Sequence, residues 1–62
     1  MKTYPELTLM HQIMCHKYCE ISKEDPYSYE RDKILDDIKK LEELAEKYFD
    51  ARINDDYMFV SD

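Results

Sequence analysis

Residues 7–21, LTLMHQIMCHKYCEI, decide the expected fold. Placed at about 100° per residue on a helix, most of their apolar side chains fall within an arc of roughly 80°. This arc holds Leu7, Met10, Met14, Tyr18 and Ile21. Leu9 and Ile13 fall on nearly the opposite side. The stretch therefore predicts a helix over about residues 4–22 that is more apolar than one neighbouring helix can cover.

Capping signals mark the start of this helix and of a second one. Thr3 and Glu6 have the spacing of a capping box. Residues 23–26 form a short loop that ends in Pro26, a residue suited to the first position of a helix. Asp25 and Ser28 compete as the cap of the second helix, and the sequence leaves that choice open. A loop this short predicts antiparallel neighbours.

The second helix, expected over about residues 27–53, has a one-sided apolar stripe. The stripe alternates in steps of three and four residues and consists of Tyr27, Ile34, Ile38, Leu41, Ala45 and Tyr48. Charged residues cover the other side, and the pairs Asp36–Lys40 and Glu43–Lys47 have the acid-first order that favours a helix. Residues 54–62 then form a short acidic tail that contains aromatic side chains.

The chain of 62 residues contains no glycine, and this absence favours helices. Tight hairpin turns, phosphate-binding loops and nucleophile elbows all depend on glycine. The expected fold class is all-α, with residues 1–62 forming one antiparallel two-helix hairpin. Because such a short hairpin buries little apolar surface, we expect a homodimer that forms a four-helix bundle and covers Leu9 and Ile13.

The net charge and the cysteines restrict the classes of binding partner and the cellular location that we expect. Nine basic and fifteen acidic residues give a net charge of −6, so we expect no direct nucleic-acid binding and no membrane binding. No stretch has the pattern of a signal peptide or the length of a membrane span. Cys15 and Cys19 are four residues apart, and on a helix their side chains lie on neighbouring turns in a geometry that ordinary disulfides rarely accommodate. We therefore expect reduced thiols and a cytoplasmic location.

The first helix holds several residue types that bind zinc. His11, Cys15 and Cys19 are weak metal candidates, because zinc favours four converging ligands and these three follow one another along the helix. His16 points about 100° away from Cys15. The favoured interpretation is that the thiols and imidazoles extend a packing face. We expect no metal and no cofactor.

No group of residues predicts catalysis. The carboxylates of the second helix lie mostly on its solvated side, where nothing prepares a general acid or base. Cys15 and His16 are adjacent in the sequence and do not face each other on a helix. We therefore expect that the chain is not an enzyme.

Three groups of residues are candidates for binding a partner. The first helix contributes Leu9, Ile13 and His16, and the tail contributes Tyr57, Met58 and Phe59. The tail has three alternatives: it plugs the open end of the hairpin, adds to a partner sheet or remains free. A candidate acidic surface that mimics nucleic-acid phosphates consists of Asp36, Asp37, Glu42 and Glu43.

These features together predict a small acidic, non-enzymatic interaction protein. It would be an intracellular inhibitor or regulator that binds a larger protein through the first helix, the tail or an acidic helix surface. The alternative is a dimeric helical-bundle RNA-binding regulator, although the basic residues are scattered among acids. A Cys/His metal-binding module is a further, less favoured hypothesis.

Overall fold

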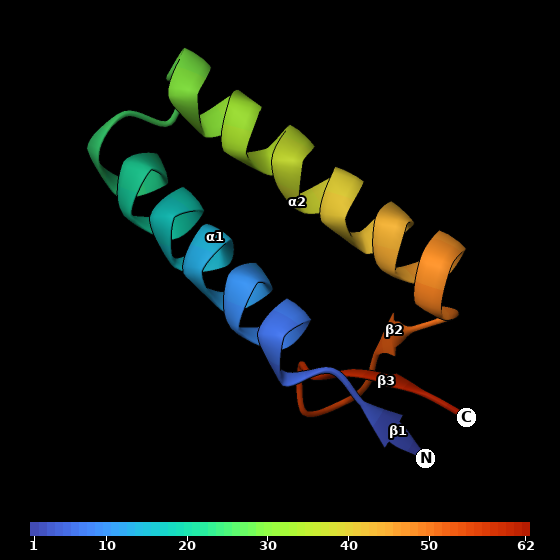
Figure 1. The fold of residues 1–62 in the computed structure, drawn as a ribbon. Coiled ribbons are helices and arrows are strands. Elements are labelled where there is room, and N and C mark those ends of the chain that lie inside the picture. Colours follow the sequence, from blue (N-terminus) through green and yellow to red (C-terminus); the bar gives the residue numbers. More distant parts are fainter.

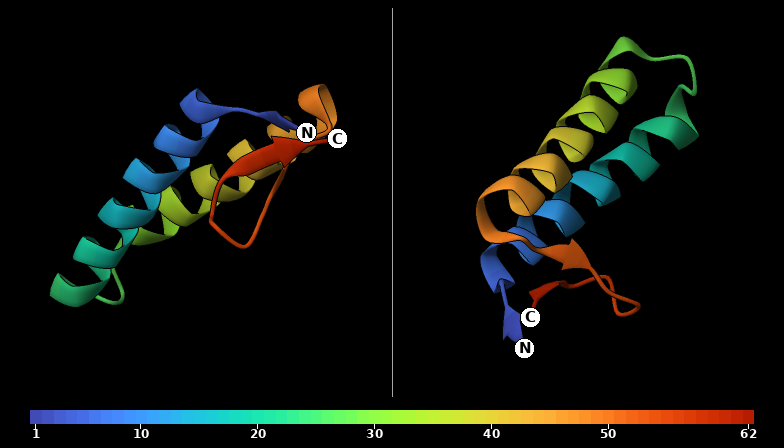
Figure 2. Two further views of the ribbon diagram at one scale, coloured as in Figure 1. Left: turned by 90° about the horizontal axis from the view of Figure 1, so that it is seen from below. Right: turned by 90° about the vertical axis from the view of Figure 1, so that its right-hand side faces the viewer.

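The computed structural model describes residues 1–62 as two long helices and a small three-stranded sheet. Helix α1 spans Pro5–Glu24 and helix α2 spans Tyr29–Phe49, and the two run antiparallel, side by side (Figure 1). Strands β1 (Lys2–Thr3), β2 (Arg52–Ile53) and β3 (Phe59–Ser61) lie at the open end of this hairpin, close to both termini (Figure 2). The fold is mostly helical, in agreement with the expected helical hairpin, but the small sheet departs from the expected all-α class.

The sheet joins the two ends of the chain. Its order is β1-β3-β2, and both pairings are antiparallel. Thr3 pairs with Val60 and Ile53 pairs with Phe59. The segment expected to be a tail after the helices thus supplies the central strand. Both neighbours of β3 are two-residue strands, so the sheet depends on the helices that it packs against.

Asn54 organises the turn between β2 and β3. Its side-chain oxygen accepts hydrogen bonds from the backbone N–H groups of Asp56 at 2.9 Å and Met58 at 3.0 Å. Tyr57 takes a positive φ of 59°, and its N–H donates to the carbonyl of Asn54 at 3.1 Å. An asparagine side chain therefore holds a hairpin turn that contains no glycine.

The ends of the helices differ in part from the expected ones. The predicted capping box is wrong, because Thr3 lies in β1 and Tyr4 occupies the N-cap of α1 without a side-chain cap bond. Ser28 caps α2, since its Oγ accepts from the N–H of Glu30 at 3.1 Å. Helix α2 ends at Phe49 and does not reach residue 53, because Asp50 adopts a left-handed conformation with φ 52° and ψ 34°. Such a residue commonly ends a helix.

Arg31 closes the loop end of the hairpin. Its guanidinium donates to the hydroxyl of Tyr18 at 2.9 Å, to the carbonyl of Pro26 at 2.7 Å and to Oγ of Ser22 at 3.1 Å. It also lies over the ring of Tyr18, 5.2 Å from the ring centroid. One side chain of α2 thus connects α1 and the loop, and it sets the level at which the two helices face each other.

The core lies where the sheet meets the helices. Phe59 is 1% exposed and packs with Ala45 and Ala51. Farther along the hairpin, Ile38 and Leu41 are buried between the helices, as the apolar stripe predicted. Other members of the predicted stripes are exposed: Met10, Tyr27 and Tyr48. Tyr27 precedes the cap of α2, and the other two lie on a side of the hairpin that no element of the chain covers.

Candidate interaction surface

Thr8, a buried polar residue of α1, attaches the sheet to the hairpin. Its Oγ1 accepts a hydrogen bond from the N–H of Phe59 at 2.9 Å and donates one to the carbonyl of Tyr4 at 3.0 Å. The ring of His11, one turn along α1, meets the Phe59 ring edge-on, with centroids 5.4 Å apart. Phe59, expected to contact a partner, is instead held in the core of its own chain, as the plugging alternative predicted.

His11 also connects α1 with α2. Its Nε2 lies 3.1 Å from Oε1 of Glu42, and its Nδ1 lies 3.6 Å from Sγ of Cys15. The order thiol, imidazole, carboxylate is that of a nucleophilic triad. However, burial raises the pKa of the Cys15 thiol, and the nearby Cys19 and Glu42 add to this rise. An activated cysteine needs a lowered pKa, so this arrangement lacks a ready nucleophile.

The contact between His11 and Glu42 was missed by the sequence analysis, which put Glu42 on a solvated acidic surface. The spacing of His11 and Cys15 was a usable signal, because residues four apart face the same way on a helix. The place of Glu42 depended on the level at which α2 packs against α1, and no local pattern specifies that level.

The candidate metal ligands do not converge. No three His, Cys, Asp or Glu side chains are grouped so that they could hold a metal ion. His16 points away from the core and lies 2.9 Å from Glu20. Cys15 and Cys19 are both free thiols, and Cys19 is exposed.

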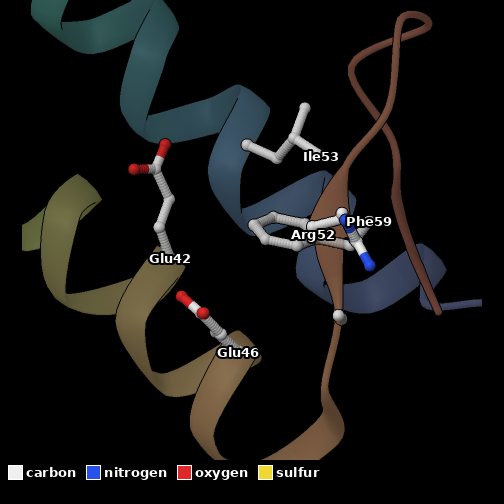
Figure 3. Close-up of a pocket in the computed structure, with 6 residues that line it drawn as sticks. Glu42, Glu46, Arg52, Ile53 and Phe59 are labelled. Carbon is white, nitrogen blue, oxygen red and sulfur yellow. The ribbon is translucent and has the colours of Figure 1, made fainter.

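A pocket of about 280 Å³ opens between α2 and β2 (Figure 3). Glu42 and Glu46 project from α2 on one side of the pocket, and Phe59 and Arg52 lie on the other side. Neither glutamate forms an ion pair with Arg52. Both are exposed, so the pocket lacks the buried, paired carboxyl groups that acid–base catalysis uses.

The four residues of the candidate acidic surface lie on different sides of α2. Glu42 turns toward α1 and His11, as described above. Asp36 pairs with Lys40 at 3.4 Å on the outer side, as its spacing predicted. At about 100° per residue, Glu43 shares that outer side with Asp36, whereas Asp37 lies well away from both.

The exposed apolar side chains are the most prominent feature of the surface. Eleven large apolar residues are exposed, whereas six hydrophobic residues are buried and two of those are alanines. Leu9 and Ile13 are 57% and 46% exposed. This confirms that a single hairpin does not cover them. Tyr57 and Met58 are exposed on the β2–β3 turn.

Several exposed residues lie on one side of the hairpin. The sheet contacts the side that carries Thr8 and His11 on α1 and Glu42 on α2. We call the opposite side the open face. At about 100° per residue, it receives one run of exposed apolar side chains from α1 and one from α2. We call these residues the apolar patch: Met10, Ile13, Leu44 and Tyr48.

A second pocket borders the apolar patch near the start of α1. It has a volume of about 360 Å³, and its apolar lining consists of Tyr4, Leu7, Met10 and Phe49 together with Pro5. Methionine and aromatic side chains are enriched at the centres of protein interfaces. Leu9 and His16 lie farther round α1, on its outer side, next to Ile13.

Neither helix combines the length and apolar character that crossing a membrane requires. Comparison of the chain with protein-family models, with curated proteins and with solved structures found no match.

Proposed function

We propose that this chain is a small non-enzymatic interaction module that acts as an inhibitor or regulator of a larger protein. One observation carries the proposal: more large apolar side chains lie exposed on the chain than are buried in its core. Monomeric proteins rarely leave contiguous apolar patches open, and such patches commonly mark sites of protein association. Both helices contribute to the patch, so an occupant would contact α1 and α2 together.

The proposed binding surface has more than one part. The apolar patch is the first part, and its self-association into a homodimeric four-helix bundle is included in the proposal. The outer side of α1, where Leu9 and His16 are exposed, is the second. Tyr57 and Met58, exposed on the β2–β3 turn, form a third group on the sheet side of the hairpin, away from the open face. A dimer formed on the open face would leave the second and third groups accessible to a larger protein.

The proposal includes phosphate mimicry only for acidic residues that share a surface. Asp36 and Glu43 lie together on the outer side of α2 and are exposed. Glu42 is engaged by His11. A reducing cytoplasmic setting also belongs to the proposal, because two free cysteines one turn apart are more typical of reducing compartments.

The test is affinity capture with a matched pair of variants. The variant L9Q/I13Q removes two exposed apolar side chains from α1, whereas Y27Q removes an exposed one from the loop. Both should remain folded, since surface changes usually cost less than about 0.5 kcal/mol each, and circular dichroism checks this. We expect one protein to bind the wild-type chain and Y27Q in a stoichiometric complex. Its affinity for L9Q/I13Q should fall at least about tenfold, the loss typical of one or two interface hot spots.

Two results would contradict the proposal. If the captured protein binds L9Q/I13Q as tightly as it binds the wild-type chain, the apolar surface of α1 is not its contact. If capture returns only RNA, the alternative of an RNA-binding regulator takes precedence. Charge reversal of Asp36 and Glu43 tests mimicry separately: unchanged affinity for the protein partner would remove mimicry from the proposal.

A further inference from the structure

We propose that a second copy of this chain covers the open face, with α1 of each copy packed along α2 of the other. This inference rests on the proposed function, because it names the occupant of the apolar patch. The hairpin would double into an antiparallel four-helix bundle with a twofold axis. The argument depends on where the charges of the open face lie relative to its apolar residues.

Contacts between the helices establish which residues lie at the same level. The rings of Tyr4 and Phe49 are 5.4 Å apart, His11 lies 3.1 Å from Glu42, and Arg31 lies 3.1 Å from Ser22. The residue numbers of each pair add to 53. By the same relation, Lys17 of α1 lies level with residues 36–37 of α2. The apolar patch lies nearer the sheet, with Met10 close to the level of Leu44.

Lys17 and Asp37 continue the two apolar runs of the open face. Lys17 follows Ile13 by one helical turn, and Asp37 precedes Leu44 by two turns, so each lies on the same stripe of its helix as the patch residues. Both are exposed, and neither forms an ion pair within its own chain. The open face thus carries an apolar half and, beyond it, Lys17 and Asp37 at the same level, with Lys33, Glu24 and Glu30 nearer the loop.

A twofold axis that runs parallel to the helices, in the plane of the open face, makes this surface complementary to itself. It places Met10 and Ile13 of one copy against Leu44 and Tyr48 of the other. It also places Lys17 of each copy against Asp37 of the other, so one interface contains two opposite-charge pairs. Glu24 and Glu30 approach each other only at the loop end, outside the apolar patch, where solvent and salt screen them.

The size of the face also suits a second copy. The molecule measures 39 × 20 × 16 Å, so its long faces approach the roughly 800 Å² that each partner contributes to a standard interface. A chain of 62 residues buries little apolar surface in its own core, and the pairing of two copies buries more without a longer chain.

Charge-reversal variants test the arrangement. We expect a wild-type dimer at micromolar concentration in sedimentation equilibrium. K17E and D37K should each raise the dimer dissociation constant by about tenfold, since each replaces two opposite-charge pairs with two like-charge pairs. A one-to-one mixture of K17E and D37K chains should form heterodimers in preference to either homodimer, and K17E/D37K should dimerise again. The control K39E makes the same change of charge on the opposite side of α2 from Asp37, and should dimerise like the wild-type chain.

The outcomes separate this inference from the proposed function. A wild-type chain that stays monomeric up to about 100 μM, the low-affinity end of ordinary association, overturns the inference. So does a dimer whose mixed variants show no preference for the heterodimer, because the charges then do not face each other. A monomeric chain would also remove self-association from the proposed function, but in either case a captured protein whose affinity still depends on Leu9 and Ile13 would leave the binding of a larger protein standing.

Discussion

Replacing Thr8 by valine should destabilise the chain by removing one buried hydrogen-bond acceptor. Valine keeps the shape of the side chain but cannot accept from the N–H of Phe59, which Oγ1 of Thr8 does now at 2.9 Å. The carbonyl of Tyr4 keeps a partner, because the N–H of Thr8 also donates to it at 3.0 Å. The substitution thus leaves a single buried donor, the N–H of Phe59, without an acceptor.

An unsatisfied buried donor costs about 1–3 kcal/mol. By per-residue scaling, a chain of this length has a total stability of roughly 3–9 kcal/mol, so T8V should remove a large part of it. In a domain this small, each kcal/mol lowers the melting temperature by about 4–8 °C. The control T8S keeps the acceptor and loses one methyl group, worth about 0.8 kcal/mol.

The assay is urea denaturation followed by circular dichroism, at a fixed protein concentration because dimerisation would add to the stability. Amide hydrogen exchange gives a site-specific readout, since the Phe59 amide should lose protection in T8V and keep it in T8S. The reasoning is refuted if T8V is as stable as T8S, or if the Phe59 amide is equally protected in both variants.

Further predictions concern the ends of α2 and the two thiols. S28A should lower the free energy of unfolding by about 0.5–2 kcal/mol and S28D should not, because only the alanine removes the cap acceptor; equal stability in urea melts would contradict this. D50G should raise the free energy of unfolding by up to about 1 kcal/mol, since glycine takes positive φ without strain. A loss of stability would contradict this, because the contacts of the Asp50 side chain would then outweigh the strain that glycine removes. Burial raises the pKa of the Cys15 thiol, so iodoacetamide should alkylate it near neutral pH more slowly than the exposed Cys19, with the difference lost in denaturant. Peptide mass spectrometry measures the two rates, and equal rates in the native chain would contradict the prediction.

The helices were predictable because their signals are local and repeated. Ile38 and Leu41 repeat the same periodic signal along α2, and both are buried. The excess of apolar residues on α1 likewise predicted that Leu9 and Ile13 would stay exposed. Homodimerisation and the partner-binding roles of these residues are still predictions, because a single chain shows what is uncovered and not what covers it.

The sheet could not be predicted from local pattern. Its strands are two or three residues long, too short to show the alternation that identifies a strand. Thr3 pairs with Val60 from the other end of the chain. This pairing depends on Thr8 and His11 holding Phe59 against the hairpin, so packing determines the sheet and local propensity does not. Thr3 was expected to cap α1, but it lies in β1 and pairs with β3 instead.

The absence of glycine does not exclude tight turns in this chain. Asp50 and Tyr57 both adopt positive φ, at 52° and 59°, the region in which glycine is usually found. For Asp50 the cost is small, because aspartate is among the residues that tolerate this region. Tyrosine is bulky and tolerates it poorly, so the turn must hold Tyr57 there by other means. The three hydrogen bonds that Asn54 makes through its side chain and its carbonyl do so.

The strain at Tyr57 supports its place in the proposed binding surface. Its side chain is 72% exposed and its ring is in no aromatic pair, so no packing within the chain offsets the free-energy cost of its positive φ. A residue in a sparsely populated conformation persists only where its surroundings impose it, and such residues concentrate at binding and catalytic sites. The turn therefore destabilises the fold while it exposes an aromatic ring to solvent, in a molecule whose total stability is small. The strain is understandable if a partner buries the ring on binding. Tyr57 lies on the side of the hairpin that a second copy on the open face would leave free.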